Sequence, residues 1–149
     1  MSPARFLRDL VVVLALTGAA VWGVTRWLLI PFSVEGPSMQ PTLGDGERVL
    51  VDLWTFRSRR PLPGDIVVVS GPADEDLVKR IAGEPRPEAD RFPPAEVPTD
   101  SPSEPAFIVL GDNAGESRDS RAFGRVPLHR IRGRVRWRYW PPSRLGSIE

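Results

Sequence analysis

Near its N-terminus the chain carries an apolar segment that is long enough to cross a lipid bilayer. Residues 10–25 contain no charge, and the apolar run resumes after Arg26 and continues to Ile30. About 20 helical residues span the hydrocarbon core of a bilayer, provided that Arg26 extends its charge to the far headgroups. Pro31 cannot continue a helix. We therefore expect a transmembrane anchor over residues 10–30.

The flanking charges predict how this anchor is oriented. Arg5 and Arg8 precede the run, and positively charged residues next to a membrane helix stay on the cytoplasmic side. Residues 1–9 should therefore be cytoplasmic, and residues 31–149 should face outward. This places the chain in the cytoplasmic (inner) membrane with a single pass.

Two other interpretations of the apolar run are open. A cleavable signal peptide would be cut after small residues, such as those at 18–20, and a core helix would be buried inside the domain. The run continues past residue 20 with Val21, Trp22 and Val24. That continuation favours an uncleaved anchor.

Beyond Pro31 the sequence is typical of one small, mainly β domain. The apolar runs are short and separated by Gly and Pro, and no long 3.6-residue period follows residue 32. Strands are predicted at residues 48–53, 66–69, 77–81, 107–110 and 130–139. The β-branched run 66–69 should be buried on both faces.

Two stretches of the domain have an unusual composition. Residues 84–106 are rich in proline and acidic residues, and we expect them to form an irregular insert. Residues 130–138 place an arginine at every second position, on one face of the predicted strand. That face should be solvated or paired with the acidic insert, with binding of anionic headgroups as the alternative. Trp54 and Phe56 either dip into the membrane or pack in the core.

The composition excludes several kinds of chemistry. The chain has no cysteine, which rules out disulfides, thiol catalysis and cysteine-based zinc sites. His129 is the only histidine, so a multi-histidine metal site is excluded too, and its place beside a predicted strand favours a solvated position over a catalytic one. A net charge of +1 gives no reason to expect a nucleic-acid partner.

The basic residues single out one position. Nineteen of the 20 are arginine, and the only lysine is Lys79. Either Lys79 is a chance remnant, or this position requires an amine that can become neutral, which an arginine cannot supply. At a reference pKa near 10.4 only roughly 0.04% of the amine is neutral at pH 7, so the site must lower the pKa by roughly 2–3 units. Burial beside Leu77, Val78, Ile81 and the strand 66–69 would do so.

Ser38 is the hydroxyl that such an amine could activate. It lies between Pro37 and Pro41, which stiffen this segment and keep it out of a helix. A neutral amine can take the proton of a serine hydroxyl and so support nucleophilic catalysis without histidine. In the simpler interpretation, Ser38 is a turn residue and Lys79 a solvated strand residue.

A third motif, residues 111–121, follows the predicted strand 107–110 and is dense in turn-forming residues. It is either a loop held by Asx turns and an Asp119–Arg121 ion pair, or a support for the amine. In the second interpretation Ser117 orients the amine, while Asp119 and Arg121 lock the loop.

Four segments resemble, in order and spacing, the motifs of the bacterial type I signal peptidases (leader peptidases). They are "GPSMQPTL" (36–43), "PGDIVVV" (63–69), "VKRIAG" (78–83) and "GDNAGESRDSRAFGRVP" (111–127). The resemblance extends from the anchor to about Arg134. It implies a coiled β-sheet domain outside the cytoplasmic membrane and a serine endopeptidase that removes signal peptides without a metal or cofactor.

The same resemblance assigns a role to each matching residue. It makes Ser38 the nucleophile and Lys79 the general base. It makes Ser117 the residue that orients the amine, and it makes Asp119 and Arg121 a structural salt bridge beside the site.

Met39 should face the membrane near the site by the same resemblance. The chain departs from the family pattern at Gly36, where some members carry a serine whose hydroxyl helps to hold the oxyanion. The oxyanion would then rely on backbone N–H groups, chiefly that of Ser38. A second departure lies at residues 83–87, which replace the usual "GxPGD". With its short insert, the chain looks like a compact variant.

The expected partners are the signal peptides of exported preproteins and membrane lipids, with the secretion translocon as a further candidate. Three rival functions are open. One is a serine–lysine peptidase for a single specialised exported substrate. Another is a self-cleaving repressor protease, against which the anchor argues. The third is a non-catalytic, membrane-tethered β module.

Overall fold

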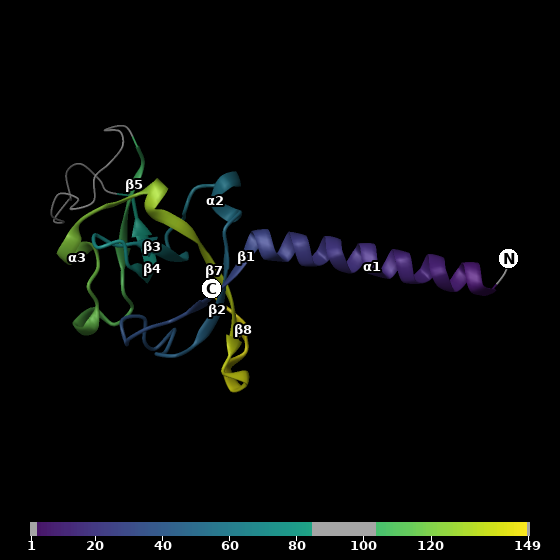
Figure 1. Cartoon of the computed structure of the whole chain (residues 1–149). Coiled ribbons are helices and arrows are strands. Elements are labelled where there is room, and N and C mark those ends of the chain that lie inside the picture. Colours follow the sequence, from purple (N-terminus) through teal and green to yellow (C-terminus); the bar gives the residue numbers. More distant parts are fainter. Residues whose placement is uncertain (1–2, 85–103, 149) are drawn as a thin grey trace.

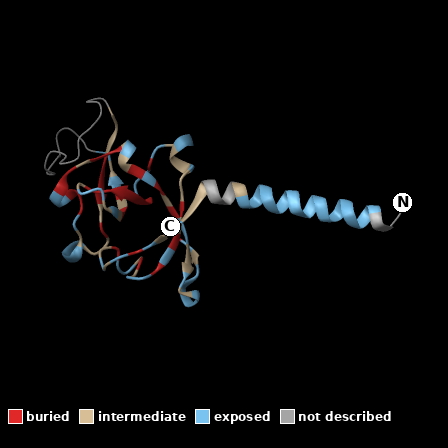
Figure 2. Cartoon of the chain, viewed as in Figure 1, coloured by how far each residue is buried: buried red, intermediate tan, exposed pale blue. Residues whose placement is uncertain are grey.

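The computed structural model of the chain describes residues 3–84 and 104–148. One long helix, α1 (Pro3–Leu28), extends away from a curled antiparallel sheet (Figure 1). The segment Arg5–Gly23 is the one helix of the described chain that is long and apolar enough to cross a membrane, and none of it is buried. Figure 2 shows the same exposure along α1. The core-helix interpretation is therefore wrong.

The helix ends two residues earlier than predicted. It stops at Leu28, and Leu29–Ser33 form strand β1, which runs antiparallel to the next strand, from Leu29 opposite Asp52 to Ser33 opposite Arg48. Pro31 explains the difference, because it holds its preceding residue extended and is tolerated in an edge strand, where one backbone edge is unpaired. The expected helix end at residue 30 is thus wrong, and the helix passes into the sheet without a linker.

The described chain forms an eight-stranded sheet, and its neighbouring strands are antiparallel. After β1 come β2 (Arg48–Asp52), β3 (Ile66–Ser70), β4 (Asp76–Gly83), β5 (Ala106–Leu110), β6 (Val126–Pro127), β7 (Ile131–Trp140) and β8 (Gly146–Ser147). Their order in the sheet is β1-β2-β7-β3-β4-β5-β6, and β8 pairs with β7. The mainly β class is confirmed, as are the five predicted strands.

Short helices connect the strands. They are α2 (Thr55–Ser58), α3 (Ser120–Phe123) and the 3₁₀ turns Ala114–Glu116, Leu128–Arg130 and Pro142–Arg144. Glu84 and residues 104–105 flank the part of the predicted insert that lies outside the described residues.

Strand β3 lies at the centre of the core, and all five of its residues are buried. Ile66 and Val68 belong to one apolar cluster, whereas Val67 and Val69 belong to another. Successive side chains of a strand point to opposite faces, so the two clusters cover the two faces of the sheet. Each fully buried side chain of this kind contributes about 1.5–3 kcal/mol. Burial of this strand on both faces is confirmed.

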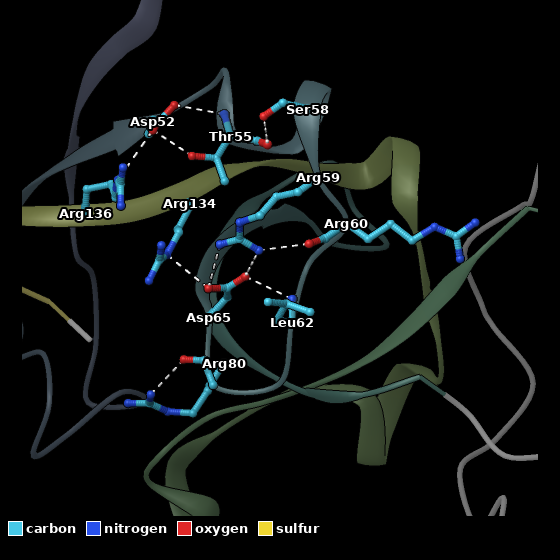
Figure 3. A network of polar contacts seen from close by, with 11 residues as sticks. Asp52, Thr55, Ser58, Arg59, Arg60, Leu62, Asp65, Arg80, Arg134 and Arg136 are labelled. Carbon is cyan, nitrogen blue, oxygen red and sulfur yellow. Dashed lines mark hydrogen bonds and ion pairs between the residues drawn. The ribbon is translucent and has the colours of Figure 1, made fainter.

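The arginines of residues 130–138 form a ladder of ion pairs with acidic residues elsewhere in the domain. The pairs are Arg130–Asp74, Arg132–Asp76, Arg134–Asp65, Arg136–Asp52 and Arg138–Glu47. Figure 3 shows two of them, at Asp65 and Asp52. These partners lie between residues 47 and 76. The expected pairing with the acidic insert concerns residues that lie mostly outside the described part of the chain, and it stays a prediction.

The strict alternation along β7 breaks down in its second half. Val135 is buried, but Trp137, two residues on, is exposed. Register shifts separate Arg48 from Val49 and Leu50 from Val51 in the pairing of β2 with β7. Such bulges bend a strand and re-aim its side chains, and here Trp137 points out of the core.

Candidate active site

The structure brings the predicted nucleophile and the only lysine together. Ser38 lies in the turn that follows β1, and Lys79 lies on β4 opposite Val67 of β3. Lys79 Nζ is 2.9 Å from Ser38 Oγ, within hydrogen-bond distance, although 41 positions separate the two residues in sequence. Lys79 itself is 2% exposed.

Burial shapes the electrostatics of Lys79. Desolvation lowers the pKa of its amine below the ordinary value of 10.5, and the carboxylate of Asp119 acts in the opposite direction without cancelling it. No ion pair with Lys79 occurs in the part of the chain that the structure describes. A buried amine without a directly paired carboxylate can lose its proton more readily and accept one from a nearby hydroxyl.

The loop after β5 holds the Ser38 segment by its backbone. Asn113 donates its N–H to the Ser38 carbonyl at 2.9 Å and its Nδ2 to the Pro37 carbonyl at 3.2 Å. The two bonds fix the residues on which the Ser38 hydroxyl depends for its direction. Asn113 was not singled out from the sequence, although the "GDN" of the third motif contains it.

Met39 fixes the same segment from the other side, and its predicted position is wrong. Its side chain is fully buried in the apolar cluster that also contains Leu43 and Val34. Leu43 also donates its N–H to the Met39 carbonyl at 2.9 Å. An apolar side chain gains more from this core than from exposure, so Met39 anchors the serine turn and does not face the membrane.

Gly111 is a second residue that sequence reasoning missed. A Cβ atom at this position would lie 2.1 Å from Ser117 Oγ and 2.6 Å from the Ser38 carbonyl oxygen. Only a glycine lets the loop backbone approach the serine turn this closely. The third motif begins with this glycine, but nothing in its spacing reveals the contact.

Asp119 organises the loop from inside. It is fully buried, forms a two-pronged ion pair with Arg121, and accepts the N–H of Gly111 at 2.8 Å. Burial alone would raise the pKa of Asp119, but hydrogen bonds from Arg121 and Gly111, together with the nearby Ser117 hydroxyl, outweigh it and hold the pKa at about 2.

This lowered pKa gives a pH-dependent contribution to stability. A carboxylate with a depressed folded-state pKa stabilises the fold above its unfolded value of 3.8, and that contribution disappears as the pH falls through about 2. The shift corresponds to about 2.5 kcal/mol. We expect Asp119→Asn to be less stable than the wild type at pH 7. The difference in free energy of unfolding between the two proteins should narrow between pH 4 and pH 2. Urea unfolding at several pH values checks this, and a gap that stays constant down to pH 2 contradicts it.

Ser117 does not occupy the position that was expected. Its Oγ is shielded from solvent and makes no well-formed hydrogen bond to any described residue, Lys79 included. It lies close enough to Asp119 to help lower that pKa, and it packs against Gly111. The expected hydrogen bond from Ser117 to the lysine amine is therefore absent from the described part of the chain.

Gly36 offers no side chain and no free N–H to a developing oxyanion. Its φ of +77° favours glycine, and its N–H donates to Asp45 Oδ1 at 2.8 Å. The N–H of Ser38, by contrast, donates to no group among the described residues. Ser38 therefore carries the backbone donor that remains open next to the hydroxyl.

Arg80 and Asp112 form a clamp on the opposite face of β4 from Lys79. Arg80 donates to both oxygens of Asp112 at 2.9 Å, and Thr42 Oγ1 donates to Asp112 Oδ2 at 2.5 Å. The clamp ties β4, the loop after β5 and the serine turn together. Since successive side chains of a strand point to opposite faces, Arg80 points away from the amine of Lys79.

The two candidate residues line an open cleft of about 560 Å³. One wall is formed by residues 32–35, at and after the end of β1, and the other by residues 75–79 of β4 and the turn before it. In the described pairings β1 bonds only to β2, and β4 bonds to β5 only from Arg80 onward. Both walls therefore present unpaired strand edges, which can bind an extended peptide.

The described residues contain no group of three or more His, Cys, Asp or Glu side chains that could hold a metal ion. The groups that do meet beside the cleft are the hydroxyl of Ser38, the buried amine of Lys79 and the backbone N–H of Ser38.

Comparison with known proteins shows which family the chain is similar to. The family model described as "Signal peptidase, peptidase S26" matches residues 7–88 and 85–140. Signal peptidase IB of Staphylococcus aureus is 27% identical, over 92% of this chain and 91% of the relative; that of strain COL is 29% identical, over 80% and 82%. The mitochondrial ATP-independent inner membrane protease subunit 1b of Arabidopsis thaliana is 37% identical, over 83% and 78%.

Proposed function

Because the chain belongs to the signal peptidase family, peptidase S26, we propose that it removes signal peptides from exported preproteins by means of a Ser38–Lys79 dyad. The observation that carries the dyad is the 2.9 Å contact between Ser38 Oγ and the buried amine of Lys79, the only lysine in the chain. Membership of the family makes the protein a serine peptidase. What we propose is the identity of its catalytic residues.

The reaction begins with proton transfer to Lys79. The neutral amine takes the hydroxyl proton as Ser38 Oγ attacks the scissile carbonyl. The protonated Lys79 then passes that proton to the leaving amine, so the C–N bond breaks and an acyl-enzyme remains. Water, deprotonated by the same amine, then attacks the ester carbonyl. The bond to Ser38 Oγ breaks, Lys79 returns the proton to that oxygen, and the signal peptide leaves as a carboxylate.

The negative charge of each tetrahedral intermediate needs a donor at a fixed place. The open N–H of Ser38 supplies one, since that of Gly36 is used by Asp45. A preorganised donor of this kind typically accounts for about 10²–10³ in rate.

The substrate binds extended along the cleft. An added strand would pair with the open edges of β1 and β4. Phe32, Val34, Leu77 and Val78 line the cleft and give it apolar walls. Such walls suit small apolar side chains at the first and third positions before the cut, in keeping with the resemblance to type I signal peptidases.

The apolar helix α1 anchors the enzyme in the cytoplasmic membrane. We infer that residues 1–9 stay in the cytoplasm because Arg5 and Arg8 flank the helix there. The sheet then lies outside, where signal peptides emerge.

Cleavage of a purified preprotein tests the proposal directly. The full chain in detergent should cut a preprotein carrying an Ala-x-Ala site and yield one new N-terminus directly after it, as found by N-terminal sequencing. The rate should rise with pH through the lowered pKa of Lys79. Ser38→Ala should abolish the product. A product that persists in Ser38→Ala would remove Ser38 as nucleophile.

A further inference from the structure

A second cavity lies where α1 meets the sheet, away from the dyad. Its volume is about 580 Å³. Leu28, Leu29, Leu50 and Trp137 give it an apolar lining, and its two charged residues are Arg136 and Asp52. None of these residues lines the cleft that contains Ser38 and Lys79. We call this cavity the anchor groove.

The position of the anchor groove relates it to the membrane. Leu28 is the last residue of α1 and Leu29 the first of β1, so the groove begins where the apolar helix ends. Figure 1 shows α1 leaving the domain between α2 and the β7–β8 hairpin. A bilayer that surrounds α1 therefore meets the domain at this groove.

Exposed tryptophans mark the rim. Trp54, which precedes α2, is 53% exposed, and Trp137 of β7 is 44% exposed. Tryptophan is enriched at the membrane–water interface, where its ring lies at the level of the headgroups. Phe56, by contrast, packs against the core. Of the two aromatic residues that the sequence placed either in the membrane or in the core, only Trp54 faces outward.

Two arginines and one carboxylate, Asp52, lie at the rim, and the ion pair between Asp52 and Arg136 is loose. Arg136 is half-exposed and contacts Asp52 at 3.4 Å, the longest contact of the β7 ladder. Both oxygens of Asp52 already accept hydrogen bonds from Trp54 and Thr55. The guanidinium of Arg57 lies over the Trp54 ring, 5.1 Å from its centre. Two guanidinium groups beside an apolar groove suit a phosphate with an attached acyl chain.

We propose that the anchor groove binds one anionic phospholipid from the membrane that holds α1. An acyl chain lies between Leu28, Leu50 and Trp137, and the phosphate lies against Arg136. The bound lipid fixes the height of the sheet above the bilayer, and with it the height of the cleft. The proposal concerns binding and does not require that the dyad be catalytic.

Native mass spectrometry of the full chain in detergent tests this site. With phosphatidylglycerol added, the wild type should retain one lipid, and it should retain phosphatidylcholine less. Arg136→Gln should lower retention about five- to tenfold. Leu50→Trp, which fills the groove, should lower it as well. Arg132→Gln is the matched control, because Arg132 lies on the same strand with similar exposure and an ion pair to Asp76 but lies outside the groove.

The outcomes separate the possible occupants. A single phosphatidylglycerol lost in Arg136→Gln and kept in Arg132→Gln supports the proposal. Equal retention of both lipids, or equal loss in both arginine variants, shows only lipid around α1 and overturns it. Two further outcomes would assign the groove to another occupant and overturn the proposal. One is a protein dimer in place of the lipid adduct. The other is an added signal peptide whose retention depends on Arg136 when retention of the lipid does not.

Discussion

Replacing Lys79 by methionine or arginine should reduce preprotein cleavage at least ~10³-fold. Removal of a general base typically costs about 10²–10⁴ in rate, and no other lysine in the chain can take over. Methionine keeps the apolar packing of a residue that is buried between β3 and the serine turn. Arginine keeps the charge but cannot become neutral. Cleavage of a preprotein under single-turnover conditions measures both losses.

Stability must be measured alongside, because arginine places a permanent charge in a buried site. Lys79→Met should unfold at a temperature close to that of the wild type, or higher, since it no longer buries an amine. Its inactivity then reports on chemistry and not on folding. Cleavage by well-folded Lys79→Met at a rate within tenfold of the wild type would exclude Lys79 as the base.

Gly111→Ala should lower kcat about 100-fold or more, although neither Ser38 nor Lys79 is substituted. The added Cβ would lie 2.6 Å from the backbone oxygen of Ser38, and backbone atoms cannot rotate away as a side chain can. The serine turn must therefore shift, and displacements of about 1 Å in a reacting group can cost 10²-fold in rate.

Gly115→Ala is the matched control for this prediction. It lies in the same loop, and a Cβ there would meet no atom within 4 Å. The double variant Gly111→Ala/Ser117→Gly removes the contact with Ser117 but leaves that with Ser38, so it should stay impaired. Wild-type kcat in Gly111→Ala, or full rescue by Ser117→Gly, would show that the approach to Ser38 is not what sets the position of the hydroxyl.

The strands could be predicted because their signals are local. The β-branched run of β3 has no helical alternative of adequate length, and the Gly- and Pro-rich segments around it mark its ends. Strand β1 was missed because Leu29 and Ile30 continue the apolar run of the anchor, and only pairing with β2 separates them from the helix.

The pairing of Ser38 with Lys79 was predictable from chemistry and not from geometry. A lone lysine in an arginine-rich chain and a serine fixed between prolines each need an explanation, and one mechanism explains both. The resemblance to a family then made the pairing specific.

The supporting contacts could not be predicted, because each depends on three-dimensional proximity. Met39 lies between the polar residues Ser38 and Gln40 in sequence, which gives no sign that the serine turn buries its side chain in the core. In sequence, Asn113 and Gly111 are common turn residues. Their contacts with the Ser38 carbonyl become apparent only when the loop is placed against the serine turn. Ser117 has the right chemistry to bind the amine, and its position in the loop directs it elsewhere.

The ion pairs of β7 show the same limit. Alternation correctly places the arginines on one face, but charge alone cannot select among the chain's acidic residues. Strand order brings Asp52, Asp65 and Asp76 beside β7 or its neighbours. Local sequence patterns do not determine strand order, so they could not identify these partners.

The pKa of Lys79 in the folded protein is the measurement that bears most directly on the dyad. Because the chain has a single lysine, metabolic labelling with ¹³C-lysine gives one side-chain ε-carbon signal, which can be followed by NMR as the pH is raised. Desolvation by burial predicts a midpoint below 10.5 in the folded, detergent-solubilised chain and a return toward the ordinary value in urea. A folded-state midpoint at or above 10.5 would mean that the amine stays protonated at neutral pH and cannot activate Ser38.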